Sequence, residues 1–578
     1  MLRPRKNFVY LDQASSGGSF NKRLSLVIPA FSTPAPVAAD IMAERSLRVG
    51  LDHYAVGRID EAICAYQSGL GIAAAAPDRV SAETVAKLHS NLGNAHMTRG
   101  DLGSAAASYK AALRLSPHLT SCWCNLGNVQ LQTGNAQDGI AFYLQALKTN
   151  PAHWASRANL AHALMATKQH PVAKALLLEL AEERPQDAKV QHQLGKVCFE
   201  LNEFDASLAH FQQAVALNPA DADSLYWIGA LRQRLGDINA AQAAYVQAAM
   251  IQPLIRRRAI KSPPDFRVLA LYAPFAGNTP AEFLFKDAAY DTDTLALLGA
   301  GEPDPALLGD VQVVVNLISD ADQAGGVLFT AARFAAMFGK PVVNEPAMIE
   351  RTKRDAIAAL LPGIAGCRVP GILRLAAGDD VSPAALVAKL PFGFPVLARP
   401  AGTHGGDDFE SFESAVDLAP FLNERPGSDH YVIEYVGYAS ADGHFRKYRF
   451  IFVGDEILPY HLAIGNGWKV HHASTDMANQ PWMRQEEAAF LDDPHAVFTP
   501  SHYQTLRAIR DRIGLDYFGI DCGLDQAGKL IVFEVNASML VHDDNAEFPY
   551  KDPHVRAIKT AFDAMLRKLA GLNLFRSD

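Results

Sequence analysis

Proline returns at a constant step of 34 residues through the first half of the chain. The positions are Pro117, Pro151, Pro185, Pro219 and Pro253. A constant step of this size indicates a repeat architecture, in which each short unit buries its apolar face against the next unit. This regularity therefore predicts a stack of similar units in the first half of the chain.

Two further series keep the same step and indicate what each unit contains. Small residues recur at Gly93, Gly127, Ala161, Gly195 and Gly229, and large apolar residues recur at Tyr109, Tyr143, Leu177, Phe211 and Tyr245. A small residue lets two helices approach each other, a large ring fills the groove between units, and proline ends the second helix. Each unit is therefore expected to be a pair of helices.

The spacing and these residue types resemble the tetratricopeptide repeat, which is a pair of antiparallel helices. An earlier copy begins near Arg45, with Gly50, Ala62 and Tyr66 at the expected positions, so six repeats are expected. Arrays of this kind form solenoids whose concave face often holds another protein. The resemblance thus implies a protein or peptide partner on the concave face.

Asparagine residues recur on the first helix of successive repeats, and two interpretations of them stay open. The positions are Asn91, Asn94, Asn125, Asn128 and Asn159. In tetratricopeptide domains such residues commonly hydrogen-bond the backbone of a bound peptide. Alternatively they are solvated groove residues, because an exposed helix face must be polar.

In the second half, residues 516–539 predict a β-hairpin, because two apolar runs are broken at 525–528 by turn residues. If Leu524 pairs with Lys529, Asp521 lies opposite Val532 and Gly519 lies opposite Glu534. The apolar face would then carry Phe518, Ile520, Cys522, Leu524, Ile531, Phe533 and Val535. The other face would carry Asp521, Glu534 and Asn536, with Gly519 and Gly523 leaving room above them. Three oxygen donors suit Mg²⁺; the alternative is a solvated polar face.

A strand with Asp near its end, a turn and then Glu-x-Asn resembles the metal-binding hairpin of ATP-grasp ligases. The resemblance extends from about Phe266 to the C-terminus. It implies that Asp521, Glu534 and Asn536 bind the Mg²⁺ ions that bridge the phosphates of ATP. The implied cofactors are therefore ATP and Mg²⁺.

Residues 394–400, FPVLARP, and the glycine-rich AGTHGGDDF that follows resemble a phosphate-binding strand and loop of the same family. Arg399 stands where the family usually has a Lys that meets the α- and β-phosphates. Arginine can bind phosphate through two parallel hydrogen bonds. Gly402, Gly405 and Gly406 would let backbone amides approach the phosphates.

Other segments resemble the rest of the nucleotide site. In PVVNEPAMIERTKRDAIAALL, residues 341–361, the resemblance implies a phosphate-facing Lys353, for which Arg351 and Arg354 compete. Residues 430–437, HYVIEYVG, resemble the hinge between the two lobes. The resemblance implies that backbone groups near the hinge residues bind adenine. These residues are Glu434, Tyr435 and Val436.

Arg449 matches an arginine that in this family steadies the transferred phosphoryl group. It would act as a catalytic residue by stabilising the charge that builds up in the transition state; a surface arginine on a strand is the alternative. Several histidines, two acids and a lysine near it could line the site of the acceptor. They are His461, Lys469, His471, His472, His542, Asp543 and Asp544.

Length and composition bound these expectations. A chain of 578 residues needs several domains. A net charge of −9 does not favour a nucleic acid or an anionic membrane as partner, and no apolar run is long enough to span a bilayer. The six cysteines show no zinc-like pairing, so reduced thiols in a cytoplasmic protein are expected.

The expected fold is an all-α solenoid followed by an α+β ATP-grasp fold with a small α/β pre-grasp domain. Strands at 267–272 and 311–318, with helices near 280–289 and 324–338, indicate the pre-grasp domain. The expected ranges are a disordered leader at 1–41, the solenoid at 42–255, a linker at 256–265, the pre-grasp domain at 266–346 and the ATP-grasp domain at 347–578.

The expected function is that of an ATP- and Mg²⁺-dependent carboxylate–amine ligase, which forms an acyl phosphate and transfers the acyl group to an amine. The repeats would present a protein or peptide substrate. The alternative is an interaction scaffold whose second half is a degenerate or nucleotide-sensing module. Arg399 and the lack of an evident acid for the ribose favour this alternative.

Overall fold

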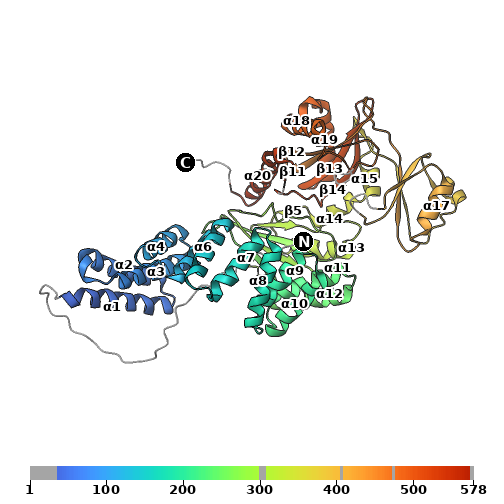
Figure 1. Cartoon of the computed structure of the whole chain (residues 1–578). Coiled ribbons are helices and arrows are strands. Elements are labelled where there is room, and N and C mark those ends of the chain that lie inside the picture. The colour runs from blue at the N-terminus through green and yellow to red at the C-terminus, as the bar shows by residue number, and fades with distance from the viewer. Residues whose placement is uncertain (1–35, 299–307, 404–407, 471–474, 544, 573–578) are drawn as a thin grey trace. The chain divides into compact units, whose positions relative to one another are not determined.

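A computed structural model of the protein describes residues 36–298, 308–403, 408–470, 475–543 and 545–572 (Figure 1). These residues form two compact units, divided between Ile251 and Gln252. Helix α1 (Pro36–Ala55) begins inside the range expected for a disordered leader, so residues 36–41 are helical. The rest of that range, residues 1–35, lies outside the described residues.

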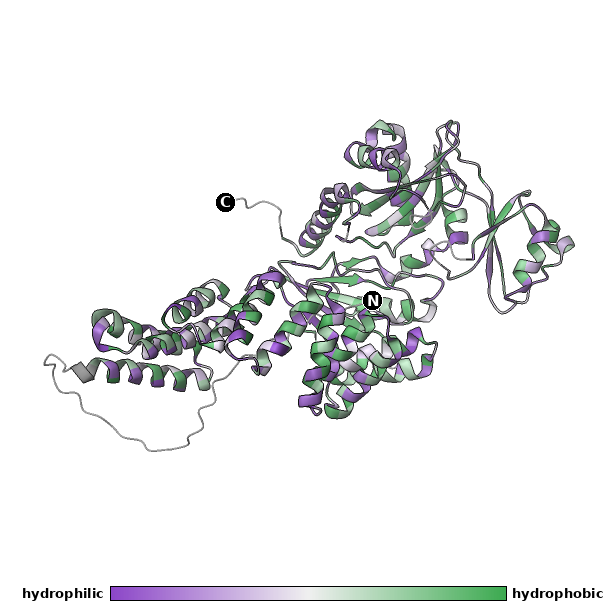
Figure 2. Ribbon diagram, viewed as in Figure 1, coloured by the Kyte–Doolittle hydropathy of each residue, from purple (hydrophilic) through white to green (hydrophobic). Residues whose placement is uncertain are grey.

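The first unit consists of helices that pack in sequence order, each against the next. They are α1, α2 (Ile59–Ala75), α3 (Ala82–Arg99), α4 (Leu102–Leu115), α5 (Thr120–Gln132), α6 (Ala136–Thr149), α7 (Trp154–Ala166), α8 (His170–Glu183), α9 (Ala188–Glu200), α10 (Phe204–Leu217), α11 (Ala222–Arg234) and α12 (Ile238–Ile251). Apolar and polar residues share each helix, as amphipathic packing requires (Figure 2). This is the helical solenoid that the 34-residue step predicts.

The small residue of each repeat makes room for the large side chain of the same repeat. A Cβ atom on Gly127 of α5 would come within 2.5 Å of the Tyr143 ring of α6, and the Tyr143 side chain is fully buried. Gly93 lies against Tyr109 in the same way. The sequence predicted only that the large ring fills the groove between units. The structure corrects this prediction, because the ring also packs on the first helix of its own repeat.

Four of the five recurring asparagines, Asn94, Asn125, Asn128 and Asn159, form an internal ladder. Asn125 donates to Asn94 Oδ1 at 3.0 Å, and Asn159 donates to Asn128 Oδ1 at 2.9 Å. The hydroxyl groups of two tyrosines of the large-residue series join the ladder, since they donate to Asn94 and Asn128 at 2.8 Å. Asn125, Asn128 and Asn159 are buried, so neither earlier interpretation describes them. They connect successive repeats.

The second unit begins with a five-stranded sheet in the order β1-β3-β2-β4-β5. The strands are β1 (Leu254–Arg257), β2 (Arg267–Tyr272), β3 (Asp291–Ala296), β4 (Val313–Asn316) and β5 (Val342–Val343). All pair in parallel except β1, which is antiparallel to β3. Helix α13 (Gly325–Ala336) follows β4 as predicted. The helix expected near 280–289 is wrong, since this segment forms turns.

The prediction of a linker at 256–265 is also wrong for its first two residues. Arg256 and Arg257 belong to β1, which is an edge strand of this sheet. The sequence hides the partner strand as well, because β3 reads DTDTLA and lacks an apolar run. Its buried Asp291 is paired with Arg258, with 2.6 Å between Nη1 and Oδ2. Charges from the supposed linker thus compensate buried acids in the sheet.

Two largely antiparallel sheets follow. The four-stranded sheet, in the order β7-β10-β8-β9, consists of β7 (Ile372–Leu375), β10 (His430–Glu434), β8 (Val396–Pro400) and β9 (Glu410–Phe412). The five-stranded sheet, in the order β12-β11-β13-β14-β6, consists of β12 (Glu456–Gly465), β11 (Phe445–Val453), β13 (Tyr517–Leu524), β14 (Leu530–Asn536) and β6 (Cys367–Arg368). The helices of this region are α14 (Pro346–Ile349), α15 (Arg354–Leu360), α16 (Pro383–Lys389), α17 (Ala415–Asn423), α18 (Pro481–Asp492), α19 (Pro500–Ile513) and α20 (Asp552–Leu569). The second unit is thus a mixed α/β region.

The predicted hairpin is present as β13 and β14, but its expected register is wrong. Leu524 pairs with Leu530, and a β-bulge next to Asp521 brings Asp521 opposite Glu534. The extra residue at the bulge is Phe533, which reaches the same pocket as Glu534. The two carboxylates therefore face each other directly, which the predicted register did not give.

The faces of the hairpin differ from the expectation for the same reason. Ile531 packs with Val436 and Tyr438, and Phe533 joins them, on the side away from the apolar core that holds Phe518. Gly519 and Gly523 do not leave open room. A Cβ atom on Gly519 would come within 2.6 Å of Met539, and one on Gly523 would come within 3.1 Å of Phe533.

Candidate functional site

The main pocket of the second unit lies between the four-stranded and the five-stranded antiparallel sheets, with a volume of about 1090 Å³ including its open mouth. Strands β8 and β10 contribute one wall, and β11, β13 and β14 contribute the other. A concave site between two sheets that combines apolar with convergent charged side chains is suited to a small-molecule ligand.

Part of the pocket lining is apolar and aromatic. Leu397 of β8 and Ile433 of β10 line it together with Val436 and Phe533. Phe409 and Trp468 meet edge to face beside them, with 5.3 Å between ring centroids. Flat apolar walls of this kind accept a planar ring.

The pocket lining also contains charged residues, and Asp521 pairs with two of the cations among them. Arg449 binds both carboxylate oxygens of Asp521, at 2.6 and 2.9 Å, and Lys447 Nζ lies 3.1 Å from Oδ2. Burial alone would raise the pKa of Asp521, but the charges of Arg449 and Lys447 hold it well below its usual range. Asp521 is therefore an ionised, buried carboxylate.

Glu534 lies across the hairpin from Asp521 and has a cation of its own. Arg354 Nη2, at the start of α15, lies 3.0 Å from Glu534 Oε1. Burial would raise the pKa of Glu534, but Arg354 lowers it, and it stays below its usual value although the charge of Asp521 opposes this. Two ionised carboxylates thus line the pocket together with the three cations that pair with them.

The donor set fits Mg²⁺ in its chemistry. Asp521, Glu534 and Asn536 all line the pocket, and carboxylate and amide oxygens are ligands that Mg²⁺ accepts. Asn536 Oδ1 accepts a hydrogen bond from Ser538 N at 2.6 Å, which orients its amide. Within the described ranges no group of three or more His, Cys, Asp or Glu side chains could hold a metal ion, so the set depends on Asn536 and on ligand oxygens.

Arg399 lies on β8 and lines the same pocket, as the resemblance implies. Its Nε donates to Thr403 Oγ1 at 3.0 Å, and its Nη2 donates to the Thr403 carbonyl oxygen. The guanidinium also lies 5.5 Å from the centroid of the Phe409 ring. The start of the glycine-rich loop is thus tied to this arginine, whereas Gly405 and Gly406 lie outside the described residues.

The three residues predicted to form a hinge all line the main pocket. Glu434 ends β10, and Tyr435 and Val436 follow it along the pocket wall. The Glu434 carboxylate accepts a hydrogen bond from Gly371 N at 2.8 Å, and Glu434 N donates to the Gly371 carbonyl oxygen at 2.8 Å. This double contact fixes the backbone at the start of the hinge.

A second pocket adjoins the first, and both are lined by Arg354, Glu534 and Asn536. Lys353 and Gly402 line only this second pocket, where the Lys353 amine is paired with Glu350. Of the three basic candidates in this segment, Arg354 is the one that reaches the main pocket. Arg351 points elsewhere, since its Nη1 lies 3.4 Å from the Ile513 carbonyl oxygen.

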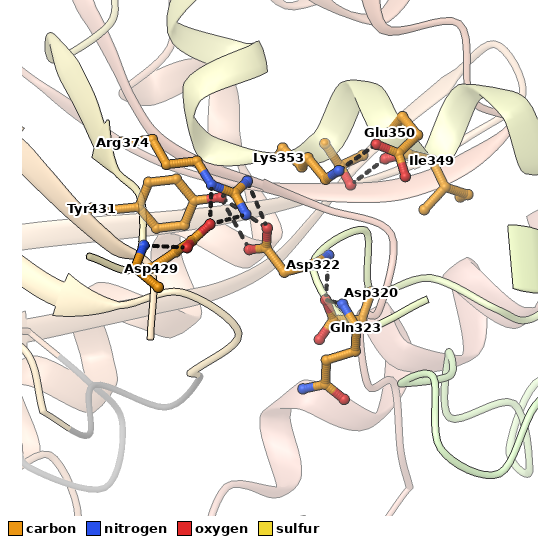
Figure 3. Close-up of polar contacts among 11 residues, drawn as sticks. Asp320, Asp322, Gln323, Ile349, Glu350, Lys353, Arg374, Asp429 and Tyr431 are labelled. Atoms are coloured by element: carbon orange, nitrogen blue, oxygen red, sulfur yellow. Dashed lines mark hydrogen bonds and ion pairs between the residues drawn. The ribbon is translucent and has the colours of Figure 1, made fainter. Parts of the chain in front are cut away.

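A polar network holds the four-stranded sheet against the loop after β4 (Figure 3). Asp322 accepts a hydrogen bond from the Tyr431 hydroxyl at 2.9 Å and one from Arg374 Nη1 at 3.3 Å. Arg374 Nε also donates to Asp429 at 3.0 Å. Since Tyr431 and Asp322 line the second pocket, this network fixes the position of its wall.

Sequence reasoning missed several residues of the main pocket. Lys447, Phe409, Trp468 and Phe533 were not expected there. Lys447 could have been found, because it lies two positions before Arg449 on one strand and therefore points to the same face. The aromatic residues come from loops and from the bulge, which no simple periodicity reveals. His471, His472 and Asp544 lie outside the described residues.

No helix among the described residues is both long and apolar enough to cross a bilayer.

A comparison with curated proteins gives no match. The solved structures that match this chain have low sequence identity to it. MamA from Desulfovibrio magneticus RS-1 is 21% identical, with a TM-score of 0.28, covering 29% of this chain and 94% of that chain. The pilF protein of Pseudomonas aeruginosa is 17% identical, with a TM-score of 0.33, covering 37% and 94%. YrrB, described as a TPR protein with an unusual peptide-binding site, is 22% identical, with a TM-score of 0.26, covering 29% and 86%.

Family models match inside the first unit. A model described as TPR repeat matches residues 93–134 and 195–236, and two models described as tetratricopeptide repeat match residues 131–196 and 222–253. These ranges coincide with the helices of the solenoid and with the 34-residue step. Arrays of this type act as scaffolds for protein interaction. The first unit of this chain is a tetratricopeptide repeat array.

Proposed function

We propose that the second unit is an ATP- and Mg²⁺-dependent carboxylate–amine ligase of the ATP-grasp type. The observation that carries this proposal is the facing pair Asp521 and Glu534 in a pocket that is lined by cations and also by apolar and aromatic side chains. A nucleotide combines a flat base with charged phosphates. The lining of the pocket therefore supplies partners for both parts of a nucleotide.

The charges of the pocket support a polyanionic ligand. Of the described residues that line it, five are basic and three are acidic. The basic residues are Arg354, Arg399, Lys447, Arg449 and Lys469. With ATP bound, the phosphate oxygens become competing partners for Arg354, Lys447 and Arg449. Mg²⁺, held by Asp521, Glu534 and Asn536, would neutralise phosphate charge and polarise the transferred phosphoryl group.

The second pocket is the proposed place of the acid substrate. It meets the main pocket at Arg354 and Glu534, next to the expected phosphates, and it carries Lys353 as a partner for a carboxylate. Attack of this carboxylate on the terminal phosphoryl group would form an acyl phosphate, with Arg449 stabilising the developing charge. The walls of both pockets would keep water from this reactive intermediate.

The repeat array has the proposed role of presenting a protein or peptide. Tetratricopeptide arrays offer a long concave surface to such partners. The buried ladder asparagines leave this surface to other side chains of the first helices. The substrate that carries the acid or the amine would therefore be part of a macromolecule or a peptide.

Two measurements on the full chain test the ligase proposal. Calorimetry should detect ATP binding that weakens at least about tenfold when EDTA removes Mg²⁺, or when Glu534→Gln removes one carboxylate charge. Hydroxylamine traps acyl phosphates as hydroxamates, so pools of amino acids and short peptides with ATP and Mg²⁺ should yield hydroxamate and ADP. Asp442→Asn is the control, since this exposed acid pairs with Arg446 outside the pocket. ATP binding that neither EDTA nor Glu534→Gln alters would overturn the proposal.

One observation favours a second candidate, a scaffold with a nucleotide-sensing module. The carboxylates that should bind Mg²⁺ are already paired with Arg449, Lys447 and Arg354. A pocket that neutralises itself in this way could bind and release nucleotide without chemistry. ATP binding without ADP or hydroxamate from any pool would favour this candidate over the ligase.

A further inference from the structure

The first helix of the repeat array carries a group of exposed apolar side chains. Helix α1 packs on α2 and α3 at one end of the first unit (Figure 1). Residues 41–56 hold more exposed large apolar side chains than any other described segment of the same length. They are Ile41, Met42, Val49, Leu51 and Val56. The outer face of a terminal repeat is normally polar, so a partner is expected to cover this one.

Three of these residues form a stripe that includes two charges. Met42, Val49 and Val56 follow each other at steps of seven residues, which is close to two helical turns. They therefore lie on one side of α1 and of the turn that follows it, with exposed fractions of 41%, 40% and 64%. Arg45 and Asp52 come three residues after Met42 and Val49, so they are exposed on the same side. Along the helix the stripe reads Met, Arg, Val, Asp, Val.

The two charges of the stripe are available to another molecule. Among the described residues, the side chains of Arg45 and Asp52 have neither a hydrogen-bond partner nor an ion-pair partner. They are also too far apart along α1 to pair with each other, because only residues three or four positions apart meet on a helix surface. A partner that covers the stripe can therefore pair with both charges.

The stripe complements itself when a second copy is turned around. In an antiparallel pair with a two-fold axis beside Val49, Met42 of each copy faces Val56 of the other, and Arg45 faces Asp52. Every such contact is made twice, as in any isologous interface. A parallel pair would place Arg45 beside Arg45 and Asp52 beside Asp52, which is unfavourable. The order of the charges therefore favours an antiparallel second copy as the occupant of this face.

We propose that two copies of the chain form a dimer through α1, with the apolar stripes packed together and Arg45 of each copy paired with Asp52 of the other. This inference does not depend on the proposed ligase activity. One helix per copy gives an interface at the small end of the range for specific pairs, so the dissociation constant should be on the order of 1–100 μM. The dimer would carry two repeat arrays and could hold a partner that has two binding segments more tightly than one array could.

The mass of the full chain in solution tests the apolar part of the interface. Sedimentation over a range of about 1–100 μM should show the mass rising from that of one chain to that of two. Val49→Lys should raise the dissociation constant at least about tenfold, because two ammonium groups would meet at the axis. Val172→Lys is the matched control, since Val172 of α8 is 56% exposed and lies outside the stripe. It should leave the mass at the wild-type value, and the circular dichroism of both variants should remain helical.

A charge exchange tests the antiparallel direction. Arg45→Asp and Asp52→Arg should each weaken the dimer at least about fivefold, because each places like charges opposite one another. An equimolar mixture of these two variants should dimerise as well as the wild type, since every acid in one variant then faces an arginine in the other. Damage to the helix could not be repaired by mixing, so recovery is specific to the interface.

Three results would overturn the dimer proposal and leave the ligase proposal intact. One is a wild-type chain that keeps the mass of a single copy throughout the concentration range, as expected if another part of the chain or a different protein covers the stripe. Another is a dimer that Val49→Lys does not weaken. The third is growth beyond two copies, since an isologous pair is closed and a head-to-tail contact is not.

Discussion

At the scale of single residues, the glycines of the repeat array are matched to the side chains that lie on them. Where the first helix has glycine, the second helix has an aromatic residue, as in Gly195 with Phe211. In the one repeat with Ala161, the partner is the smaller Leu177. Each pair therefore keeps a constant total volume, as close packing requires.

Gly195→Ala tests this matching. The new Cβ would come within 2.8 Å of the buried Phe211 ring, so we expect a loss of about 1–3 kcal/mol in the free energy of unfolding. In a Phe211→Leu background, which copies the Ala161 and Leu177 pair, the same change should cost less than half as much. Urea unfolding of the four proteins measures the coupling. Equal costs in both backgrounds would show that the volumes are independent.

At the scale of elements, the asparagine ladder couples one repeat to the next through side chains buried between helices. Asn128 accepts from the hydroxyl of Tyr143 and from Asn159, and donates to Asn125 at 3.2 Å. Buried polar groups that lose their hydrogen-bond partners destabilise the protein. An asparagine on the surface makes only local hydrogen bonds, so its loss should matter less.

Asn128→Ala should therefore lower the free energy of unfolding by about 1–3 kcal/mol, because it removes bonds to three buried partners. Asn91→Ala is the matched control. Asn91 belongs to the same sequence series, but its amide only donates to the Lys87 carbonyl oxygen of its own helix, at 2.9 Å on the exposed side. Circular dichroism during urea unfolding measures both variants. A similar loss in the two would contradict the ladder's role.

Sequence patterns predicted correctly the helices and strands in which a single repeat length or a continuous apolar run dominates. The 34-residue step gave the helix pairs, and the apolar runs gave β2, β4 and the β13–β14 hairpin. Strand β3 was missed because Asp291 and Asp293 are buried against arginines that come from elsewhere in the chain. The hairpin register was missed because the turn pairs Leu524 with Leu530 instead of Lys529, and because the bulge at Asp521 shifts the pairs beyond it by one more residue. A bulge leaves no periodic trace in the sequence.

The candidate site shows the same limit. Motif resemblance led to Arg399, Glu434, Arg449, Asp521 and Glu534, which the structure brings to one pocket. It did not reveal that Arg354, rather than Lys353, reaches that pocket, because a shift of one position along a turn decides where a side chain points. Tertiary contacts settle such details, and a single sequence does not contain them.

At the scale of the whole molecule, the division between Ile251 and Gln252 assigns β1 to the second unit. Strand β1 supplies backbone hydrogen bonds to β3, and the segment after it supplies Arg258 to the buried Asp291. A cut at the sequence-predicted boundary would remove both. The strand therefore belongs to the fold of the second unit rather than to a linker.

Two fragments test this assignment. We expect residues 252–578 to unfold at a higher urea concentration than residues 266–578, with a free energy of unfolding that is about 2–4 kcal/mol larger. The shorter fragment exposes an edge of β3 and leaves buried acids with fewer cations. Arg258→Ala in the longer fragment separates the lost charge from the lost strand. Equal urea midpoints for the two fragments would show that β1 contributes nothing to the second unit.

The walls of the main pocket come from segments spread between residues 354 and 536, all of which follow the repeats in the chain. During translation at about 5–20 residues per second, the repeats leave the ribosome first and need only neighbours in sequence to fold. The pocket closes only after its last strand has emerged. If the second unit is the ligase proposed above, a nascent chain would be able to engage a partner through its repeats before the nucleotide pocket exists, so that binding of the partner would precede chemistry in the history of each molecule.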